Sequence, residues 1–221
     1  MNRFGVLGGT FNPIHFGHLR AATEVAERLE LERVLLVPSA QPPHKQGSGE
    51  DPVAPAELRL AWVERVCTDD PRFEACDLEV RRGGASYTVD TLRALAEQHP
   101  GARPVFLIGS DAFMLLGTWR EPKQLFGLAD FAVMTRPGTP GDLRDWIPEA
   151  MRPDFEIAAS GQIATHRATG GAVSAVSISA LEISSSDIRA RLREGRSIHY
   201  LVPSAVRRDI EARGVYALGE G

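Results

Sequence analysis

Short apolar runs and helix-periodic segments alternate along the first part of the chain. Residues 3–7 and residues 34–37 are brief apolar runs of the kind that form buried strands. Between them, apolar residues recur at helical spacing at positions 19, 22, 26 and 29, which predicts a helix that begins near Gly17 or His18. A strand, a loop, a helix and a strand in succession form a βαβ unit, and this unit predicts a parallel sheet.

The same two patterns continue to the end of the chain. Apolar positions 58, 62 and 66 predict one helix, and positions 89, 92 and 96 predict another that opens at Thr88. We expect further strands at residues 73–80, 105–108, 131–134 and 173–178, and helices at residues 185–194 and between Pro203 and Gly214. The pattern predicts an α/β fold, a doubly wound Rossmann-like parallel sheet, with a helical C-terminal portion at about residues 184–216.

One region interrupts this order. Residues 138–171 are rich in Pro, Gly and Asp, and we interpret them as a variable insertion with some helix around residues 143–151. A chain of 221 residues fits one domain that carries such an insertion, so we expect residues 1–221 to form a single domain.

Composition excludes several classes of protein. The chain is 43% hydrophobic and 24% charged, with a net charge of −4 and no long basic run, which argues against general nucleic-acid binding. No apolar stretch reaches membrane-spanning length, and no leader-like segment precedes the first strand, so we expect a cytoplasmic protein with no membrane partner. The two cysteines, Cys67 and Cys76, lack metal-binding spacing, and we expect no metal held by protein ligands alone.

The loop between the first strand and the first helix has the composition of a phosphate-binding loop. It reads Gly8-Gly9-Thr10-Phe11-Asn12-Pro13-Ile14-His15-Phe16-Gly17-His18. Glycines let the backbone approach a phosphate, and a helix N-terminus offers N–H donors. His15 and His18 are three residues apart, so both imidazoles face one side of the helix start. Taken alone, these residues are better explained by a Gly-Gly turn and by capping or surface histidines.

A second polar helix start lies far away in the sequence. Residues 183–189 read Ile-Ser-Ser-Ser-Asp-Ile-Arg, so Ser184 and Ser185 offer hydroxyl and backbone donors and Arg189 offers a planar charged fork. A serine N-cap beside a surface arginine would explain the same residues.

Three shorter stretches follow predicted strands or precede a predicted helix. They are Pro42-Pro43-His44-Lys45, Ala85-Ser86-Tyr87-Thr88, and Gly109-Ser110-Asp111 with Thr118-Trp119 shortly after it. Singly, each is explained by a proline turn, a helix cap or a strand-end loop with a core tryptophan.

Together these motifs resemble a known family. Residues 8–18 resemble the signature of the nucleotidyltransferase superfamily with the His-x-Gly-His motif, and residues 183–189 resemble its Ile-Ser-Ser-Thr-x-Ile-Arg motif. With the three shorter stretches, the chain looks like bacterial nicotinate-nucleotide adenylyltransferase from Arg3 to Tyr216, apart from residues 138–171. It departs from that pattern at Asn12, where Asp is frequent, at Arg120, where Tyr is frequent, and at Ser186, where Thr is usual.

The resemblance implies transfer of the adenylyl group of ATP to nicotinate mononucleotide, which gives nicotinate adenine dinucleotide and pyrophosphate in NAD biosynthesis. The acceptor phosphate is mostly a dianion near pH 7, so positioning and electrostatics would suffice for catalysis. Phosphopantetheine adenylyltransferase, which shares the Gly-Thr-Phe and His-x-Gly-His pattern, stays an alternative, as does a nucleotide-binding sensor without catalysis.

The resemblance also implies a set of site residues. The catalytic group would be His15, His18, Lys45 and Arg189. ATP would contact Gly8, Gly9, Thr10, Phe11, Gly109, Asp111, Arg136, Ser184 and Ser185. Nicotinate mononucleotide would contact His44, Tyr87, Thr88 and Trp119. Mg²⁺ would arrive with ATP and need few protein ligands, and a homo-oligomer is compatible with this interpretation.

Overall fold

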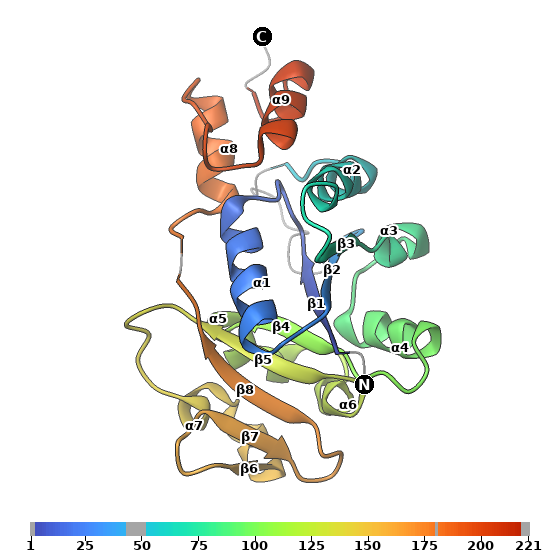
Figure 1. The fold of residues 1–221 in the computed structure, drawn as a ribbon, viewed down its shortest axis with the longest axis vertical. Coiled ribbons are helices and arrows are strands. Elements are labelled where there is room, and N and C mark those ends of the chain that lie inside the picture. Colours follow the sequence, from blue (N-terminus) through green and yellow to red (C-terminus); the bar gives the residue numbers. More distant parts are fainter. Residues whose placement is uncertain (1–2, 43–51, 180, 218–221) are drawn as a thin grey trace. The chain divides into compact units, whose positions relative to one another are not determined.

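The computed structural model describes residues 3–42, 52–179 and 181–217 and contains an eight-stranded sheet with flanking helices (Figure 1). The strand order is β3-β2-β1-β4-β5-β8-β7-β6. The strands are β1 Phe4–Gly9, β2 Arg33–Pro38, β3 Phe73–Ala75, β4 Val105–Gly109, β5 Asp130–Thr135, β6 Phe155–Ile157, β7 Ile163–His166 and β8 Ala172–Ser177. The order and the flanking helices confirm the predicted Rossmann-like α/β class.

The described residues contain the helices that the sequence predicts and several shorter ones. They are α1 Phe16–Arg28, α2 Ala56–Cys67, α3 Leu78–Arg82, α4 Thr88–Gln98, α5 Ser110–Met114, α6 Pro122–Leu128, α7 Leu143–Trp146, α8 Ser185–Arg193 and α9 Ser204–Arg213, with 3₁₀ turns η2 Leu116–Thr118 and η3 Glu149–Asp154. Gly214 ends α9 in the left-handed conformation, as its position after the last helical residue predicts.

The chain forms two compact units. Unit 1 comprises Met1–Gly8, Ala21–Leu35 and Tyr87–Ala180, and unit 2 comprises Gly9–Arg20, Leu36–Ser86 and Leu181–Gly221. Helix α1 and strand β2 each contribute residues to both units.

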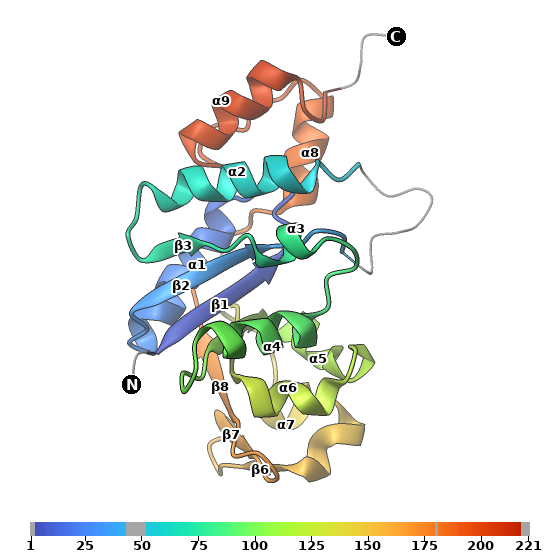
Figure 2. The same cartoon turned by 90° about the vertical axis from the view of Figure 1, so that its right-hand side faces the viewer.

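Unit 1 contains the parallel strands that the sequence predicts. Strand β1 pairs with β4 with Gly5 opposite Val105, β4 pairs with β5, and β5 pairs with β8, all in parallel. Phe106, Phe126 and Phe131 form an aromatic core between these strands and α6, with the rings of Phe126 and Phe131 4.9 Å apart. Helices α4 and α6 lie side by side (Figure 2).

The insertion at residues 138–171 extends this sheet, which the sequence analysis missed. Its helical part is short, α7 and η3, and it is followed by β6 and β7. These two strands pair antiparallel with each other, and β7 also pairs antiparallel with β8. Figure 1 shows the three strands as neighbouring arrows. Strands of three and four residues are too short for an alternating pattern to be recognised, so they could not be predicted.

Residues 73–80 were expected to form one strand, and this expectation is wrong. Strand β3 ends at Ala75, and α3 begins at Leu78. The Arg81 N–H donates to the Asp77 carbonyl and the Gly83 N–H to the Glu79 carbonyl. These helical hydrogen bonds replace the ladder that a longer strand would need, and Gly83 ends the turn at a positive φ of 68°.

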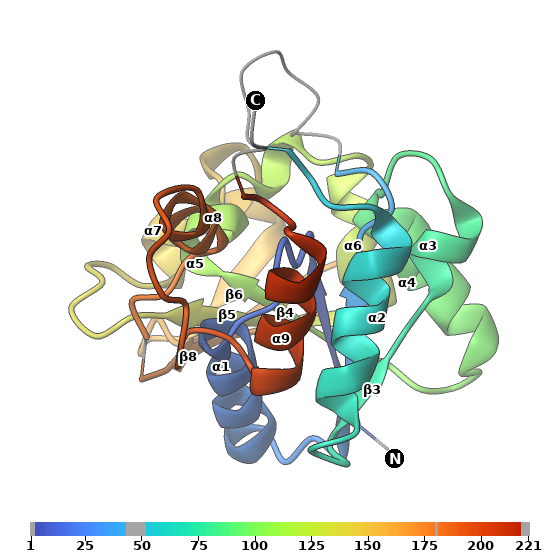
Figure 3. The same ribbon diagram turned by 90° about the horizontal axis from the view of Figure 1, so that it is seen from above.

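Unit 2 is built around α2 and α9, which lie side by side (Figure 3). Trp62 is fully buried, and its indole Nε1–H donates to Asp209 Oδ2 at 2.8 Å. The buried face of α2 contains Arg59, Trp62, Val63 and Val66. Of the apolar positions that predicted this helix, Trp62 and Val66 are buried and Leu58 is half-buried.

Candidate functional site

The loop that follows β1 is held in one conformation by backbone contacts within unit 2. The Ser39 N–H donates to the Gly9 carbonyl at 2.9 Å. A Cβ at Gly9 would lie 3.1 Å from the Phe11 ring, so glycine makes this close approach possible. Phe11 itself has a φ of +48°, a left-handed conformation that side-chain-bearing residues rarely adopt. The predicted ATP contacts Gly9, Thr10 and Phe11 therefore lie in one tightly specified turn.

His15 and His18 lie together at the start of α1, as their spacing predicts. Their rings stack with centroids 3.7 Å apart, and the His15 backbone N–H donates to His18 Nδ1 at 3.3 Å. Because Nδ1 of His18 accepts, a neutral His18 carries its proton on Nε2. The Phe11 ring meets the His18 ring edge-on at 5.1 Å, so the loop and the imidazole pair form one cluster.

The two imidazoles differ in their surroundings. His15 is 5% exposed, and its Nδ1 has no partner within the described residues. Burial lowers the pKa of His15 to about 4, so this imidazole is neutral at pH 7 and acts as a hydrogen-bonding group without a full charge.

Helix α8 brings the distant serine–arginine segment onto the same loop. Ser184 caps the helix by accepting from the Asp187 N–H, and Ser185 Oγ donates to the Pro13 carbonyl at 2.9 Å. Arg189 donates from Nη1 to the Asn12 carbonyl at 2.9 Å and from Nη2 to Ser186 Oγ at 3.1 Å. Arg189 is 5% exposed, so the interpretation of it as a surface arginine is wrong.

Asn12, which we set apart as a departure from the resembling family, is a structural junction. Its Nδ2 donates to the Pro52 carbonyl at 3.2 Å, and its Oδ1 accepts from the Ala54 N–H at 2.9 Å and from the Tyr216 hydroxyl. Burial raises the pKa of the Tyr216 phenol, which keeps that group a donor. An aspartate could not donate to Pro52, so the amide suits this position.

Arg59 also contacts the loop, and the sequence analysis missed it. Its guanidinium is 1% exposed and donates to three backbone carbonyls: Thr10 at 2.6 Å, Ala54 at 2.8 Å and Ala40 at 3.0 Å. The sequence contained an indication of this role. Arg59 precedes Trp62 by three residues and Val66 by seven, and this helical spacing places a charged side chain on the apolar face of α2.

Four of the predicted ATP contacts lie in unit 1, at the ends of parallel strands. Gly8 lies near the end of β1, Gly109 ends β4, Asp111 is in the first turn of α5, and Arg136 follows β5. Because β1, β4 and β5 are parallel, these residues share the carboxyl edge of the sheet, where ligands bind in such folds. A Cβ at Gly109 would lie 2.6 Å from Asp111 Oδ1, so glycine leaves room for that carboxylate.

The predicted acceptor contacts Tyr87, Thr88 and Trp119 also lie in unit 1. Tyr87 occupies the N-cap of α4 and Thr88 is its first residue. Trp119 follows η2 and packs edge-on against Phe106, with ring centroids 6.3 Å apart. His44 and Lys45 fall outside the described residues.

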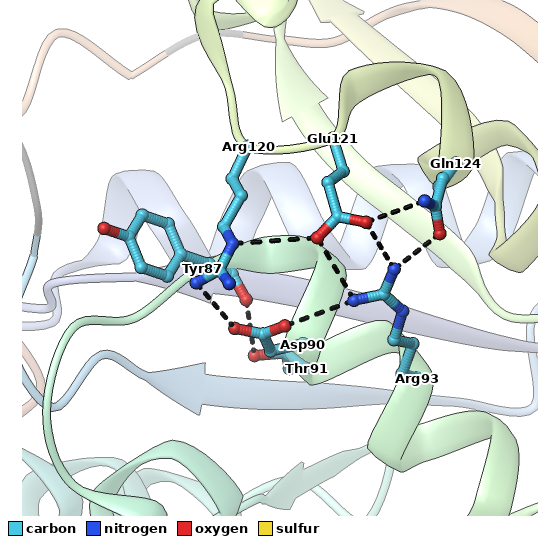
Figure 4. A network of polar contacts seen from close by, with 7 residues as sticks. All are labelled: Tyr87, Asp90, Thr91, Arg93, Arg120, Glu121 and Gln124. Atoms are coloured by element: carbon cyan, nitrogen blue, oxygen red, sulfur yellow. Dashed lines mark hydrogen bonds and ion pairs between the residues drawn. The ribbon is translucent and has the colours of Figure 1, made fainter.

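A charged network joins the start of α4 to the loop after Trp119 (Figure 4). Arg93 bonds Glu121 at 2.6 Å and Asp90 at 3.5 Å, and it holds the pKa of the Glu121 carboxyl below its usual range. The Arg120 guanidinium lies 4.8 Å from the centre of the Tyr87 ring. Arg120 occupies a position where the family frequently has tyrosine. Its guanidinium covers the ring of Tyr87 at the N-cap of α4.

Comparisons with known proteins identify the family of this chain. Residues 6–191 match the cytidylyltransferase-like family. The chain is 43% identical over 215 residues to a probable nicotinate-nucleotide adenylyltransferase of Geotalea daltonii, covering 97% of this chain and 98% of that one. It is 40% identical over 222 residues to the protein of the same name in Symbiobacterium thermophilum, covering 100% and 98% of the two chains.

Solved structures show the same fold. The nicotinic acid mononucleotide adenylyltransferase of Plasmodium falciparum, complexed with NaAD, superimposes with a TM-score of 0.69 at 17% identity and 98% coverage of both chains. With family matches along nearly the whole chain and both signature motifs joined in one cluster, this chain belongs to the nicotinate-nucleotide adenylyltransferase family.

Proposed function

We propose that this protein transfers the adenylyl group of ATP to nicotinate mononucleotide and releases pyrophosphate. The observation that carries the proposal is the docking of α8 on the loop at residues 9–18. Through Ser185 and Arg189, it gathers a helix start, two imidazoles and a buried arginine around one turn. Its relatives at 40–43% identity bear the name of this activity.

The reaction needs no protein nucleophile. A phosphate oxygen of the mononucleotide attacks the α-phosphorus of ATP, the new P–O bond forms, and the bond from the α-phosphorus to the bridging oxygen breaks to release pyrophosphate. The protein has to align the two phosphates and offset the charge that grows on the leaving group.

We assign the phosphates of ATP to groups in unit 2. The N–H groups of Thr10 and Phe11 and the Nε2–H of His18 would donate to them, and His15 would add a neutral donor. Arg189 would bind the outer phosphates from its place beside Asn12, together with Ser184 and Ser185. Lys45 would add a mobile charge over the reacting phosphates, and His44 would contact the acceptor.

We also propose contacts for residues of unit 1. Gly8, Gly109, Asp111 and Arg136 would line the adenosine side, with Asp111 on a ribose hydroxyl. Trp119 would stack on the pyridine ring, and the N–H groups at Tyr87 and Thr88 would meet the nicotinate carboxylate.

We propose that Mg²⁺ arrives with ATP and binds the phosphates and water, where it would neutralise charge on the triphosphate. Across residues 3–42, 52–179 and 181–217, no group of three or more His, Cys, Asp or Glu side chains could hold a metal ion. In the same described ranges, no helix is long and apolar enough to cross a membrane.

A substrate panel tests the proposal. Pyrophosphate release would be measured with ATP and Mg²⁺ and with nicotinate mononucleotide, nicotinamide mononucleotide or phosphopantetheine as acceptor. We expect turnover with nicotinate mononucleotide. Turnover only with phosphopantetheine would support that adenylyltransferase instead, and ATP binding without turnover for any acceptor would support a sensor.

A further inference from the structure

Arg59 has no part in the mechanism proposed above, yet it is among the most buried charges of the described residues. All three printed contacts of its guanidinium go to backbone carbonyls, those of Thr10, Ala40 and Ala54, within unit 2. Burying an arginine requires that its N–H groups be satisfied, and these carbonyls satisfy them. The shortest contact, 2.6 Å, goes to the turn that precedes the two histidines.

The contact with Thr10 fixes the direction of a second group. The Thr10 carbonyl and the Phe11 N–H belong to one peptide unit, and this unit is trans, because Asn12–Pro13 is the one cis bond in the described chain. In a planar trans peptide, the C=O and the N–H point in opposite directions. When the Thr10 carbonyl is held on Arg59, the Phe11 N–H must point away from α2.

This orientation is one that the turn would not adopt freely. Phe11 has a φ of +48°, which is unfavourable for a residue with a side chain. A charge-assisted hydrogen bond to the adjoining carbonyl is a strong restraint against relaxation of that angle. Because the Phe11 ring also meets His18 edge-on, the same restraint bears on the position of the imidazole.

We propose that Arg59 is a positioning residue for phosphate binding, which holds the Thr10–Phe11 peptide so that the Phe11 N–H donates to the phosphates of ATP. The proposal rests on the proposed function, since it takes the turn at residues 9–11 to be the phosphate site. Arg59 acts from behind the loop and does not itself touch the substrate.

The first test uses the wild-type protein and inorganic tripolyphosphate as the probe. In amide NMR spectra, we expect the Phe11 N–H resonance to move downfield on saturation with tripolyphosphate. A Phe11 amide that does not respond while tripolyphosphate binds would overturn the proposal, whatever happens to any variant.

The second test compares Arg59→Met and Arg59→Lys with a control on the same helix pair. Arg59→Met should weaken tripolyphosphate binding and raise the KM for ATP by about tenfold or more, the worth of a charge-assisted hydrogen bond, with the acceptor KM changed by less than about twofold. Arg59→Lys keeps the charge without the planar fork, so we expect its tripolyphosphate affinity to stay about threefold or more below that of the wild type.

Asp209→Ala is the matched control, because it removes the contacts of α9 with Trp62 and Arg65 of α2, and an ion pair with Arg213 within α9, without touching the loop. It should lower stability and leave tripolyphosphate affinity unchanged. Equal losses in Asp209→Ala and Arg59→Met would reduce Arg59 to a stabilising residue and overturn the proposal.

The two proposals fail separately. If the wild type binds tripolyphosphate with the expected Phe11 shift but turns over no acceptor, the adenylyl-transfer proposal fails and the role of Arg59 stands. If the wild type turns over nicotinate mononucleotide and Arg59→Met keeps its ATP KM, only the role of Arg59 fails.

Discussion

At the scale of single residues, the stacked imidazoles of His15 and His18 are in different environments although they belong to one motif. His15 is buried and neutral, whereas His18 is half-buried and accepts at Nδ1 from the His15 backbone N–H. We therefore expect His18 to carry more of the transition-state stabilisation.

His18→Ala should lower kcat by about 10²–10³, because the loss of one preorganised donor to a developing negative charge commonly has that effect. ATP affinity should weaken much less. Steady-state kinetics with both substrates checks this, with circular dichroism to confirm the fold. Near-normal kcat in a folded variant would remove His18 from the catalytic group.

His15 should make the protein less stable in mild acid. Its pKa is lowered from 6.5 to about 4 in the fold, so between these values the unfolded chain binds a proton that the folded chain excludes. Stability therefore falls as the pH drops through this window, by about 2 kcal/mol between pH 7 and pH 5.

Urea unfolding at pH 7 and pH 5 measures this effect. In His15→Gln, the difference in unfolding free energy between the two pH values should shrink by about 2 kcal/mol. If the difference between the two pH values were the same in His15→Gln and the wild type, His15 would take up a proton as readily in the folded protein as in the unfolded chain.

Arg189→Ala should weaken ATP binding by about ten- to a hundredfold, because a charge-assisted hydrogen bond to phosphate is worth about 1.5–3 kcal/mol. The acceptor KM should change little. Lysine would replace it incompletely, since it lacks the planar fork. Calorimetry on each folded variant measures the ATP affinity. If Arg189→Ala binds ATP as tightly as the wild type, the role of Arg189 is limited to its hydrogen bond with the Asn12 carbonyl.

At the scale of elements, the start of α1 depends on a glycine for close packing. A Cβ at Gly17 would lie 3.0 Å from the His15 ring and 3.3 Å from the Ile183 carbonyl. Both contacts are tighter than an ordinary Cβ contact, so the His15 ring would have to shift by a few tenths of an ångström to admit a methyl group.

Gly17→Ala should lower kcat/KM by about tenfold even though alanine favours the helix by about 1 kcal/mol over glycine. Gly127→Ala in α6 is the matched control, because its new Cβ would meet only Thr169 Cγ2, at 3.5 Å, an ordinary contact. The control should keep full activity. Equal kinetics for the two variants would show that the contact with His15 does not matter.

At the scale of the whole molecule, we expect the choice of acceptor to depend on the start of α4 in unit 1. Tyr87 occupies the N-cap without a side-chain cap hydrogen bond, so the donors of this helix start are not taken by that side chain. A carboxylate satisfies such donors, whereas a carboxamide must turn its own N–H groups toward them.

We therefore expect kcat/KM for nicotinate mononucleotide to exceed that for nicotinamide mononucleotide by at least tens-fold, since an unpaired buried donor costs about 1–3 kcal/mol and the lost charge adds to it. Competition between the two acceptors at fixed ATP measures the ratio. Equal kcat/KM values for the two acceptors would contradict a carboxylate-binding site at the start of α4 and would leave the proposal of adenylyl transfer unaffected.

The parts of the fold that have a local cause can be predicted from the sequence alone. Apolar periodicity placed α1, α2, α4, β4 and β5, and glycine and proline signals placed the ends of α9. The two signature motifs identified the loop and the serine–arginine helix start, because a phosphate site made of backbone donors needs small residues and caps in a fixed local order.

Contacts between residues that are distant in the sequence are seen only in the tertiary structure. Arg59 reaches Thr10 across 49 positions, Arg189 reaches Asn12 across 177, and Tyr216 reaches Asn12 across 204. No local pattern encodes such pairs, since a buried polar group is stabilised by whichever partner the fold brings to it. The same reason explains β6 and β7, whose few residues form strands only because β8 provides an edge for pairing.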